Sequence, residues 1–296
     1  MDKTLIIGSC TVDIVVPTPK LPKSTEDINS GEHHYSLGGC AYNVAQIFNL
    51  LNLPFLHAVT IGSGIYGDFV KKELEKNNFP VFRTSNESHG ACLCLVEDNG
   101  ERSFIAYHGI EYKFDRSWFK DIDTSEFKQV FVCGLEVEED TGSEIVSFLE
   151  ENRIENIYFA PGPRLLTIDK DLLNRLMKLK PIIHLNEQEI LDYTNAKDVH
   201  EAVRILHKEN DNDIIVTLGK DGSLLYSKEE EFTLLSRESE VVDTVGAGDC
   251  HLGTYMAYRF MSKDKKEAMH KANLFASEVI RHIGSTLKYE DIKDLV

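Results

Sequence analysis

Short apolar runs alternate with amphipathic helical patterns along nearly the whole chain, and this alternation limits the possible folds more than any other feature. The apolar runs that read as strands span residues 4–8, 56–61, 130–133, 157–160, 182–185, 214–218 and 223–226. Helical spacing of apolar residues occurs at 43–51, 69–76, 143–151, 172–179, 199–208 and 266–283. Such alternation predicts an α/β fold in which a mostly parallel sheet carries helices on both faces. Ligands of such sheets bind at the carboxyl ends of the strands, where we therefore look for site residues.

Two stretches interrupt this alternation. Residues 14–37 contain three prolines, and residues 90–109 read as a hairpin with its turn at Asp98-Asn99-Gly100. An Asn-Gly pair between two strand-like runs is the strongest short signal for a hairpin. We therefore expect a large α/β domain made of 1–13, 38–89 and 110–296, and a small β lid made of 14–37 and 90–109. Both faces of the hairpin are apolar, which predicts that one face contacts a second subunit in a homodimer.

The charge balance of the 296-residue chain is acidic, with 49 acidic and 32 basic residues and a formal net charge of −17. Nucleic acids and anionic membranes bind basic surfaces, so we expect no general affinity for either. No apolar run reaches the roughly 18 residues that a membrane span needs, and the first residues lack the features of a signal peptide. The six cysteines contain no C-x-x-C pair, which favours free thiols in a reducing cytoplasm.

Residues 243–250 read Asp-Thr-Val-Gly-Ala-Gly-Asp-Cys and lead into a helical pattern that should begin near Ala247. Gly246 and Gly248 lack Cβ atoms where the chain turns into this helix, so backbone N–H groups stay open to a ligand. With the positive end of the helix dipole, the N–H groups of Gly246, Ala247 and Gly248 predict an anion site. Asp249 adds a carboxylate that could accept a proton from an attacking hydroxyl during phosphoryl transfer. The alternative is that Asp249 only favours the first helical turn.

Four motifs resemble those of the ribokinase family, the PfkB-type carbohydrate kinases. Residues 243–249 resemble the carboxy-terminal signature of that family, and residues 38–45 its amino-terminal glycine motif. Asn186-Glu187-Gln188-Glu189 resembles its Asn-x-x-Glu motif, and residues 216–222 its nucleotide-side strand and turn. The resemblance implies a ribokinase-like three-layer sandwich with a small β-sheet lid. It also implies an ATP-dependent kinase that phosphorylates a hydroxymethyl group of a sugar or sugar-like compound.

The resemblance assigns the acceptor site to Asp13, Gly38, Gly39 and Asn43. A carboxylate such as that of Asp13 suits this role because it accepts hydrogen bonds from two hydroxyl groups at once. Adjacent glycines allow the backbone to approach a substrate closely. The alternatives are that Asp13 is an ordinary loop residue and that Gly38 and Gly39 merely start the following helix.

The resemblance assigns the nucleotide side to Asn186, Thr217, Gly219, Gly222 and Asn273. Asn186 and Glu189 form an oxygen-rich pair that suits Mg²⁺, directly or through water. The alternative for this pair is a capping interaction at a helix start. Some relatives also need a monovalent cation such as K⁺, which would lie near Asp243, Val245 and Gly284.

A competing motif is the G-x-G-x-x-G pattern of residues 62–67, with Glu87 about 20 positions further on. This pattern is typical of dinucleotide-binding folds, but here it follows the second expected strand, and Glu87 lies in a turn. A dinucleotide-dependent oxidoreductase is therefore disfavoured. No G-x-x-x-x-G-K-[ST] pattern is present, which excludes a P-loop kinase.

The acceptor itself stays open. Cys40 occupies a position where ribokinases usually have lysine, which argues against ribose. Four aromatic residues could stack on a base, namely Tyr42, Phe104, Tyr107 and His108, so a nucleoside kinase is the alternative within the family. A catalytically silent sugar-binding sensor is the alternative outside enzymes, and a retained Asp249 argues against it.

Overall fold

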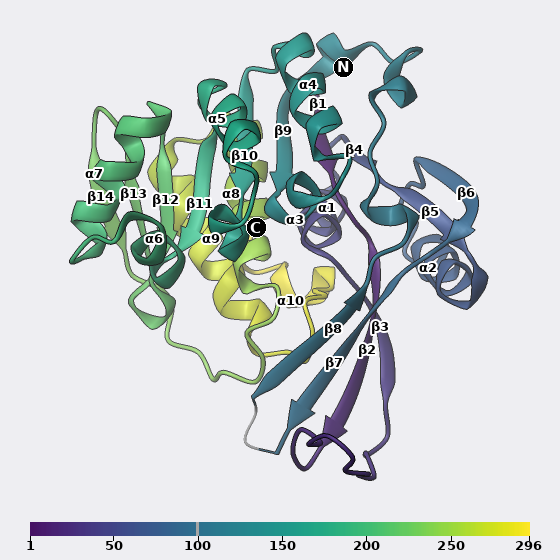
Figure 1. The fold of residues 1–296 in the computed structure, drawn as a ribbon. Helices are drawn as coiled ribbons and strands as arrows, with labels where there is room; N and C mark the ends of the chain where they lie inside the picture. Colours follow the sequence, from purple (N-terminus) through teal and green to yellow (C-terminus); the bar gives the residue numbers. More distant parts are fainter. Residues whose placement is uncertain (99–100) are drawn as a thin grey trace.

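A computed structural model describes residues 1–98 and 101–296 of the chain. Its main sheet has eight strands in the order β14-β13-β12-β11-β10-β9-β1-β4 (Figure 1). In that order the strands are Glu231–Leu234, Ser223–Tyr226, Ile214–Thr217, Ile182–Asn186, Asn156–Ala160, Phe127–Cys133, Lys3–Ile7 and Phe55–Ala58. All neighbours pair in parallel except β13, which is antiparallel to both β12 and β14. The predicted mostly parallel sheet is confirmed.

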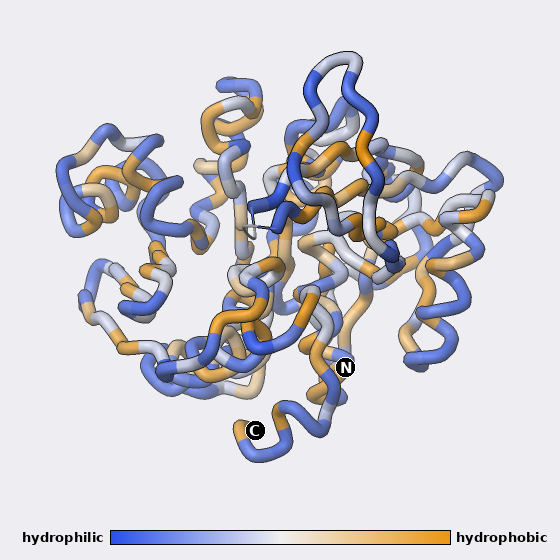
Figure 2. The backbone as a smooth tube through the Cα atoms, turned by 90° about the horizontal axis from the view of Figure 1, so that it is seen from below, coloured by the Kyte–Doolittle hydropathy of each residue, from blue (hydrophilic) through white to orange (hydrophobic). Residues whose placement is uncertain are grey.

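Both faces of the main sheet are apolar, and helices cover each of them. The helices are α1 (Cys40–Leu50), α2 (Gly64–Lys76), α3 (Gly134–Glu138), α4 (Gly142–Asn152), α5 (Lys170–Lys178), α6 (Glu187–Thr194), α7 (Val199–Asn210), α8 (Ala247–Phe260), α9 (Lys265–Val279) and α10 (Tyr289–Ile292). Successive strand residues enter opposite cores: Ile6 packs with α1, α8 and α9, whereas Leu5 packs with α4, α5 and α7. Figure 2 shows hydrophobic stretches towards the interior and hydrophilic residues along the outer turns. The prediction of helices on both faces is confirmed.

The expected strand at 56–61 is in fact two strands. β4 ends at Ala58 in the main sheet, and β5 (Thr60–Ser63) pairs with β6 (Arg83–Ser88) in a separate two-stranded sheet. The break is a tight turn in which the N–H of Val59 donates to the carbonyl of His57 at 3.0 Å. An apolar run by itself does not reveal such a turn.

Close packing accounts for the glycines of the competing G-x-G-x-x-G pattern. A Cβ atom on Gly62 would lie 2.7 Å from the carbonyl oxygen of Glu87, and one on Gly67 would lie 2.2 Å from that of Gly62. Both glycines therefore allow α2 and the two-stranded sheet to approach each other. The strand before them, β5, lies outside the main sheet, so the pattern lacks the setting that a dinucleotide site requires.

A small sheet lies apart from the main one, in the order β3 (His34–Gly38), β2 (Thr11–Thr18), β7 (Ala91–Glu97) and β8 (Arg102–Tyr107) (Figure 1). Most of its strand residues lie in the two stretches that interrupt the sequence pattern, although β2 begins at Thr11 and β3 ends at Gly38. Because β2 begins at Thr11, the exact division at residues 13 and 14 stays a prediction. Asn99 and Gly100 of the expected hairpin turn lie outside the described residues.

The register of the small sheet decides which side chains share its inner face. Asp13 lies opposite Cys92, Cys94 opposite Phe104, and Val96 opposite Arg102. Paired residues point to the same side and alternate residues along a strand do so too. Asp13, Phe104 and Arg102 therefore project from one face of the sheet.

One buried carboxylate holds both ends of the β7–β8 hairpin. Glu111, in a short 3₁₀ helix at Ile110–Tyr112, accepts hydrogen bonds from the N–H of Gly90 at 2.9 Å and the N–H of Gly109 at 3.0 Å. A Cβ atom on Gly90 would lie 2.1 Å from the carbonyl oxygen of Tyr107. The hairpin is thus anchored where it leaves and rejoins the large domain.

Among the helices of the described ranges, none combines the length and apolar character that a membrane span would need.

Candidate active site

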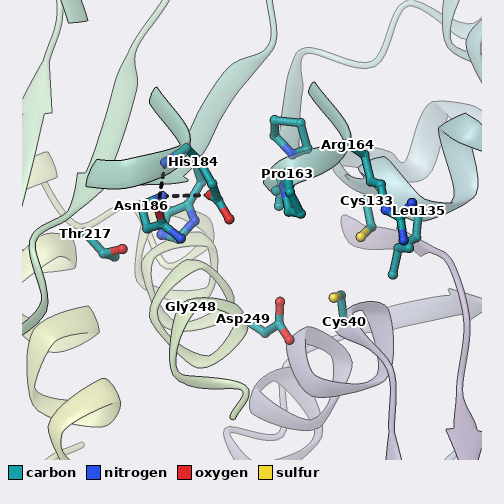
Figure 3. A pocket seen from close by; sticks show the side chains of 14 residues that line it. Cys40, Cys133, Leu135, Pro163, Arg164, His184, Asn186, Thr217, Gly248 and Asp249 are labelled. Carbon is teal, nitrogen blue, oxygen red and sulfur yellow. Dashed lines mark hydrogen bonds between the residues drawn. The ribbon is translucent and has the colours of Figure 1, made fainter. Parts of the chain in front are cut away.

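A cavity lies at the carboxyl ends of four adjacent strands, β9 to β12, facing the amino-terminal end of α8 (Figure 3). The last residues of these strands line it, namely Cys133, Ala160, Asn186 and Thr217. Cys40, Glu189, Gly248 and Asp249 also line the cavity. The structure therefore brings the glycine motif, the Asn-x-x-Glu motif, the nucleotide-side strand and the 243–249 stretch to one place.

The amino-terminal end of α8 is shaped by glycine. Gly246 has φ 74°, and a Cβ atom there would lie 2.3 Å from the Cβ of Ser285. The N–H of Gly246 donates to no acceptor in the described ranges, whereas that of Ala247, also predicted to be open, is not open because it donates to the carbonyl of Thr244 at 3.2 Å. The N–H of Gly248, by contrast, has no protein acceptor in the described part of the chain, and a Cβ atom there would meet only His184, at 3.9 Å. The helix start thus presents open N–H groups, where an anion is favoured.

Asp249 lies beside these N–H groups and is held by Asn43. The Nδ2 of Asn43 donates to Oδ2 of Asp249 at 2.8 Å, and the Oγ of Ser285 donates to Oδ1 of Asn43 at 2.7 Å. Burial raises the pKa of Asp249, while hydrogen bonds from Asn43 and the thiol of Cys40 act to lower it. The raised pKa makes the carboxylate a better proton acceptor than an ordinary aspartate.

Two of the predicted acceptor residues, Asp13 and Gly38, lie against each other. A Cβ atom on Gly38 would lie 2.1 Å from Oδ2 of Asp13, so only glycine leaves room for that carboxylate. Gly39, with φ 99°, precedes α1 and lies against the carbonyl of Ser9. Burial raises the pKa of Asp13 to about 6, and a hydrogen bond from Thr11 opposes the shift. The two glycines therefore have a packing role that also places Asp13.

Glu136 is a candidate that the sequence analysis missed. It lies in α3 directly after β9, only 2% exposed, and its Oε1 accepts the N–H of Ser9 at 2.8 Å. Its Oε2 is buried with no hydrogen-bond partner among the described residues, and burial raises its pKa. A lone carboxylate between Leu135 and Val137 at a strand end was the available signal. A buried acceptor without a partner costs stability unless a ligand satisfies it.

Asn186 and Glu189 form a capping box at the start of α6. The N–H of Glu189 donates to Oδ1 of Asn186 at 2.8 Å, and the N–H of Asn186 donates to Oε2 of Glu189 at 2.9 Å. Burial and the charge of Asp249 raise the pKa of Glu189. The capping alternative is therefore present, and Oε1 of Glu189 remains for another partner. Asp249 and Glu189 thus place two mutually repelling carboxylates in the lining of one cavity, and a cation bound there would reduce the repulsion.

The remaining nucleotide-side residues differ in position. Thr217 lines the cavity, and Gly219, with φ 60°, has open space at its Cβ position. A Cβ atom on Gly222 would lie 2.0 Å from the carbonyl of Leu234, so this glycine serves packing. Asn273 is buried, does not line the cavity, and donates to the carbonyl of Leu234 at 2.9 Å. The structure thus brings only part of this predicted set to the cavity.

A chain of buried polar groups links Asn273 to the cavity. Oδ1 of Asn273 faces Nε2 of His251 at 3.1 Å, and Nδ1 of His251 faces Nε2 of His184 at 3.1 Å. Burial lowers the pKa of both histidines, which keeps them neutral. Because Oδ1 can only accept, His251 donates through Nε2 and accepts through Nδ1. His184 therefore donates through Nε2, and its Nδ1 is an acceptor in the cavity lining.

The three residues of the predicted cation site also come together. Asp243 is buried; its Oδ1 accepts the N–H of Val245 at 2.9 Å, and its Oδ2 accepts the N–H of Gly284 at 2.7 Å. This carboxylate therefore joins the turn before α8 to the turn that contains Gly284.

The sequence matches a known protein family along nearly its whole length. The pfkB family of carbohydrate kinases matches residues 1–292. The chain belongs to this family. The sugar kinase YegV of Escherichia coli (strain K12), itself uncharacterized, is 27% identical over 95% of this chain and 89% of that protein. The deoxyribokinase of Salmonella typhimurium is 28% identical over 97% of this chain and 95% of its own.

The solved structures agree on the fold. A candidate ribokinase II of E. coli, solved with ATP and Mg²⁺, has a TM-score of 0.82 at 21% identity and covers 100% of this chain and 99% of its own. The predicted ribokinase-like fold and the assignment to the carbohydrate kinases are both confirmed. A dinucleotide-dependent oxidoreductase is accordingly excluded.

The structure of this carbohydrate kinase shows that one of the four aromatic residues expected to stack on a base, Tyr42, is not available for that role. Tyr42 is only 3% exposed and packs against Phe79, with ring centroids 5.4 Å apart. His108 is stacked on Tyr112, with centroids 3.8 Å apart. Tyr42 is therefore a core residue, and its aromatic ring signals packing rather than base recognition. Phe104, 57% exposed on the inner face of the small sheet, remains available.

The substitution Asp249→Asn tests the role of the carboxylate. Turnover should fall by about 10²–10⁴-fold, because an amide accepts no proton at neutral pH. The fold should become more stable at neutral pH. The raised pKa of Asp249 means that the folded protein binds this proton more tightly than the unfolded chain, so ionisation above the unfolded pKa disfavours folding. Steady-state kinetics and thermal unfolding measure the two effects.

The matched control is Asp171→Asn, an exposed carboxylate in the first turn of α5. It removes the same helix-end charge and should leave turnover unchanged. If Asp249→Asn retained more than about a tenth of wild-type turnover, Asp249 would be a helix-end residue and not the base.

Proposed function

We propose that this kinase transfers the γ-phosphate of ATP to a hydroxymethyl group of a sugar or sugar-like acceptor. The observation that carries the proposal is the Asp249 carboxylate, held by Asn43 beside the open N–H groups at the start of α8. A base next to an anion site is the arrangement that phosphoryl transfer to a hydroxyl requires.

The residues divide the work as follows. Asp249 accepts the proton as the acceptor oxygen bonds to the γ-phosphorus, and the bond from that phosphorus to the bridging oxygen of ADP breaks. The open N–H groups of Gly246 and Gly248 stabilise the negative charge on the transferring group. Asp13, Gly39, Asn43 and Glu136 hold the acceptor. Because these groups are fixed by packing, the acceptor hydroxyl is oriented before the reaction.

The nucleotide side is formed by Asn186, Thr217 and Gly219, with Gly222 and Asn273 shaping the walls behind them. Mg²⁺, when bound, would neutralise phosphate charge next to Asn186 and Glu189. Asn186 already accepts one hydrogen bond and Glu189 has one oxygen to spare, so we expect contact mostly through water. The expected monovalent cation near Asp243, Val245 and Gly284 would compete with the guanidinium of Arg102, which lies 2.8 Å from Asp243.

The acceptor is proposed to be a neutral sugar other than ribose. Cys40 and Cys133 give the cavity an uncharged wall next to Asp249, where the ribokinases that the motifs resemble carry a lysine. The deoxyribokinase among the similar proteins is consistent with such an acceptor. A nucleoside remains the second candidate because Phe104 is exposed on the inner face of the small sheet. A silent sugar sensor is disfavoured, since it would need no base.

A panel of acceptors tests the proposed function. Free sugars, deoxysugars and nucleosides are each mixed with ATP and Mg²⁺, and release of ADP is followed. We expect one or more neutral sugars to stimulate release, and the release to require Mg²⁺. Stimulation by nucleosides alone would favour the second candidate. If no acceptor stimulated release while ligands still bound, the protein would be the sensor.

The acceptor KM should depend on pH through Asp13. Its raised pKa, about 6, means that the carboxylate gains a proton as the pH falls through that value and then accepts fewer hydroxyl hydrogen bonds. The acceptor KM should therefore rise below about pH 6 and level off above it. Asp13→Asn should raise this KM at all pH values and remove the step. A wild-type KM that is constant from pH 5 to 8 would contradict the assignment.

We also propose a homodimer through the small sheet, in the cytoplasm. The outer face of the sheet exposes Tyr35, Ile105 and Tyr107 at 48%, 63% and 59%, and such apolar patches commonly mark subunit contacts. All six cysteines are free thiols, as a reducing compartment allows. Light scattering of the wild type and of Ile105→Lys tests the dimer. A wild-type monomer at micromolar concentration would refute it, and a dimeric Ile105→Lys would move the contact elsewhere.

A further inference from the structure

An ion pair joins the small sheet to the turn that leads into α8. Nη2 of Arg102, at the start of β8, lies 2.8 Å from Oδ1 of Asp243. The carboxylate is 1% exposed and the guanidinium side chain 22% exposed. In Figure 1 the start of β8 lies next to the segment that enters α8. A buried charge with a single partner of opposite sign depends strongly on that partner.

Asp243 holds the backbone of the turn that leads into α8, so loss of the ion pair would affect that turn. Its two oxygens hold the N–H groups of Val245 and Gly284, and its own N–H donates to the carbonyl of Ile280 at 3.0 Å. These bonds fix the turn that ends at Gly246, where the open N–H groups begin. An uncompensated negative charge at Asp243 would favour other arrangements of this turn.

The surroundings of Asp243 do not fit a potassium ion. The two oxygens of a carboxylate offer about four lone-pair positions, and two backbone N–H groups and the guanidinium occupy three of them. Among the described residues, Arg102 is the cation that pairs with this carboxylate, and its guanidinium would repel a second positive charge placed beside it. A bound K⁺ at this carboxylate would therefore have to displace Arg102.

We propose that Arg102 is a positioning residue that replaces the monovalent cation and orders the anion site when the small sheet closes over the cleft. Arg102 belongs to the small sheet and Asp243 to the large domain, so the ion pair forms only when the two are together. Closing the sheet then orders the turn at Val245 and Gly246 at the same time. This inference rests on the proposed function, since it concerns the site at which phosphate is transferred.

Replacing Arg102 with methionine keeps the length and removes the charge. Turnover is measured at equal ionic strength in KCl, NaCl and choline chloride. The wild type should be equally active in all three salts. Arg102→Met should lose turnover on the order of tenfold to a hundredfold in choline chloride, because a shifted site slows the reaction. KCl should restore much of this loss, since the vacated position can now take a cation. Arg102→Lys should retain most of the activity.

The matched control is Lys20→Met, which removes a cation from the other stretch of the lid, residues 14–37, where Lys20 pairs with Glu26 in the connection after β2. It should behave as the wild type in all three salts. Thermal unfolding supplies a readout that needs no activity: KCl should raise the midpoint of Arg102→Met above its value in choline chloride and leave that of the wild type unchanged. This arm separates failure of the inference from failure of the proposed function.

Several results would overturn the inference. A wild type that requires K⁺ would show that Arg102 does not replace the cation. Unchanged turnover in Arg102→Met, or a loss that KCl does not reverse and Arg102→Lys shares, would exclude a role as the supplied charge. An effect confined to the acceptor KM would make Arg102 a substrate contact instead.

Discussion

The candidate site depends on the side-chain amide of Asn43, which connects three segments of the chain by hydrogen bonds. The amide donates to Asp249, 206 residues away, and accepts from Ser285, 242 residues away. One amide thus fixes the glycine motif of α1, the base at the start of α8 and the turn after α9 relative to one another. Each bond uses a different end of the amide, so its orientation is determined. A hydrophobic residue of similar size could fill the space but could orient none of the three.

The parallel sheet brings these segments close enough for the hydrogen bonds of Asn43 to form. Because β9 to β12 run in the same direction, their carboxyl ends form one edge, and α8 lies against it with its amino-terminal end towards the cavity. The small sheet then completes the site from outside, through Asp13 on one strand and Arg102 on another. Glu111 limits its freedom at the hairpin ends. The candidate site is therefore formed between two sheets, and Glu111 holds the small sheet to the large domain at both ends of the β7–β8 hairpin.

Local patterns were enough to predict most strands and helices, including the start of α8 at Ala247. They also located Asp249, because a carboxylate among glycines at a helix start is a local feature. They failed where the outcome depends on distant contacts. Tyr42 is in the core because Phe79 packs against it, and Glu136 matters because the N–H of Ser9 faces it. Likewise, no local signal pairs Arg102 with Asp243, since pairing follows from how the two sheets meet.

The site concentrates carboxylates whose pKa burial raises, namely Asp13, Glu136, Glu189 and Asp249. In a protein with a net charge of −17, their ionisation disfavours the folded state at neutral pH. Hydroxyl groups of an acceptor and a divalent cation would satisfy or neutralise these groups, so ligands should stabilise the protein by more than their contacts alone suggest. At Asp243 the buried negative charge is compensated by the guanidinium of Arg102, a group of the protein itself. We therefore expect the folded protein to be less stable without the acceptor and the divalent cation than with both bound.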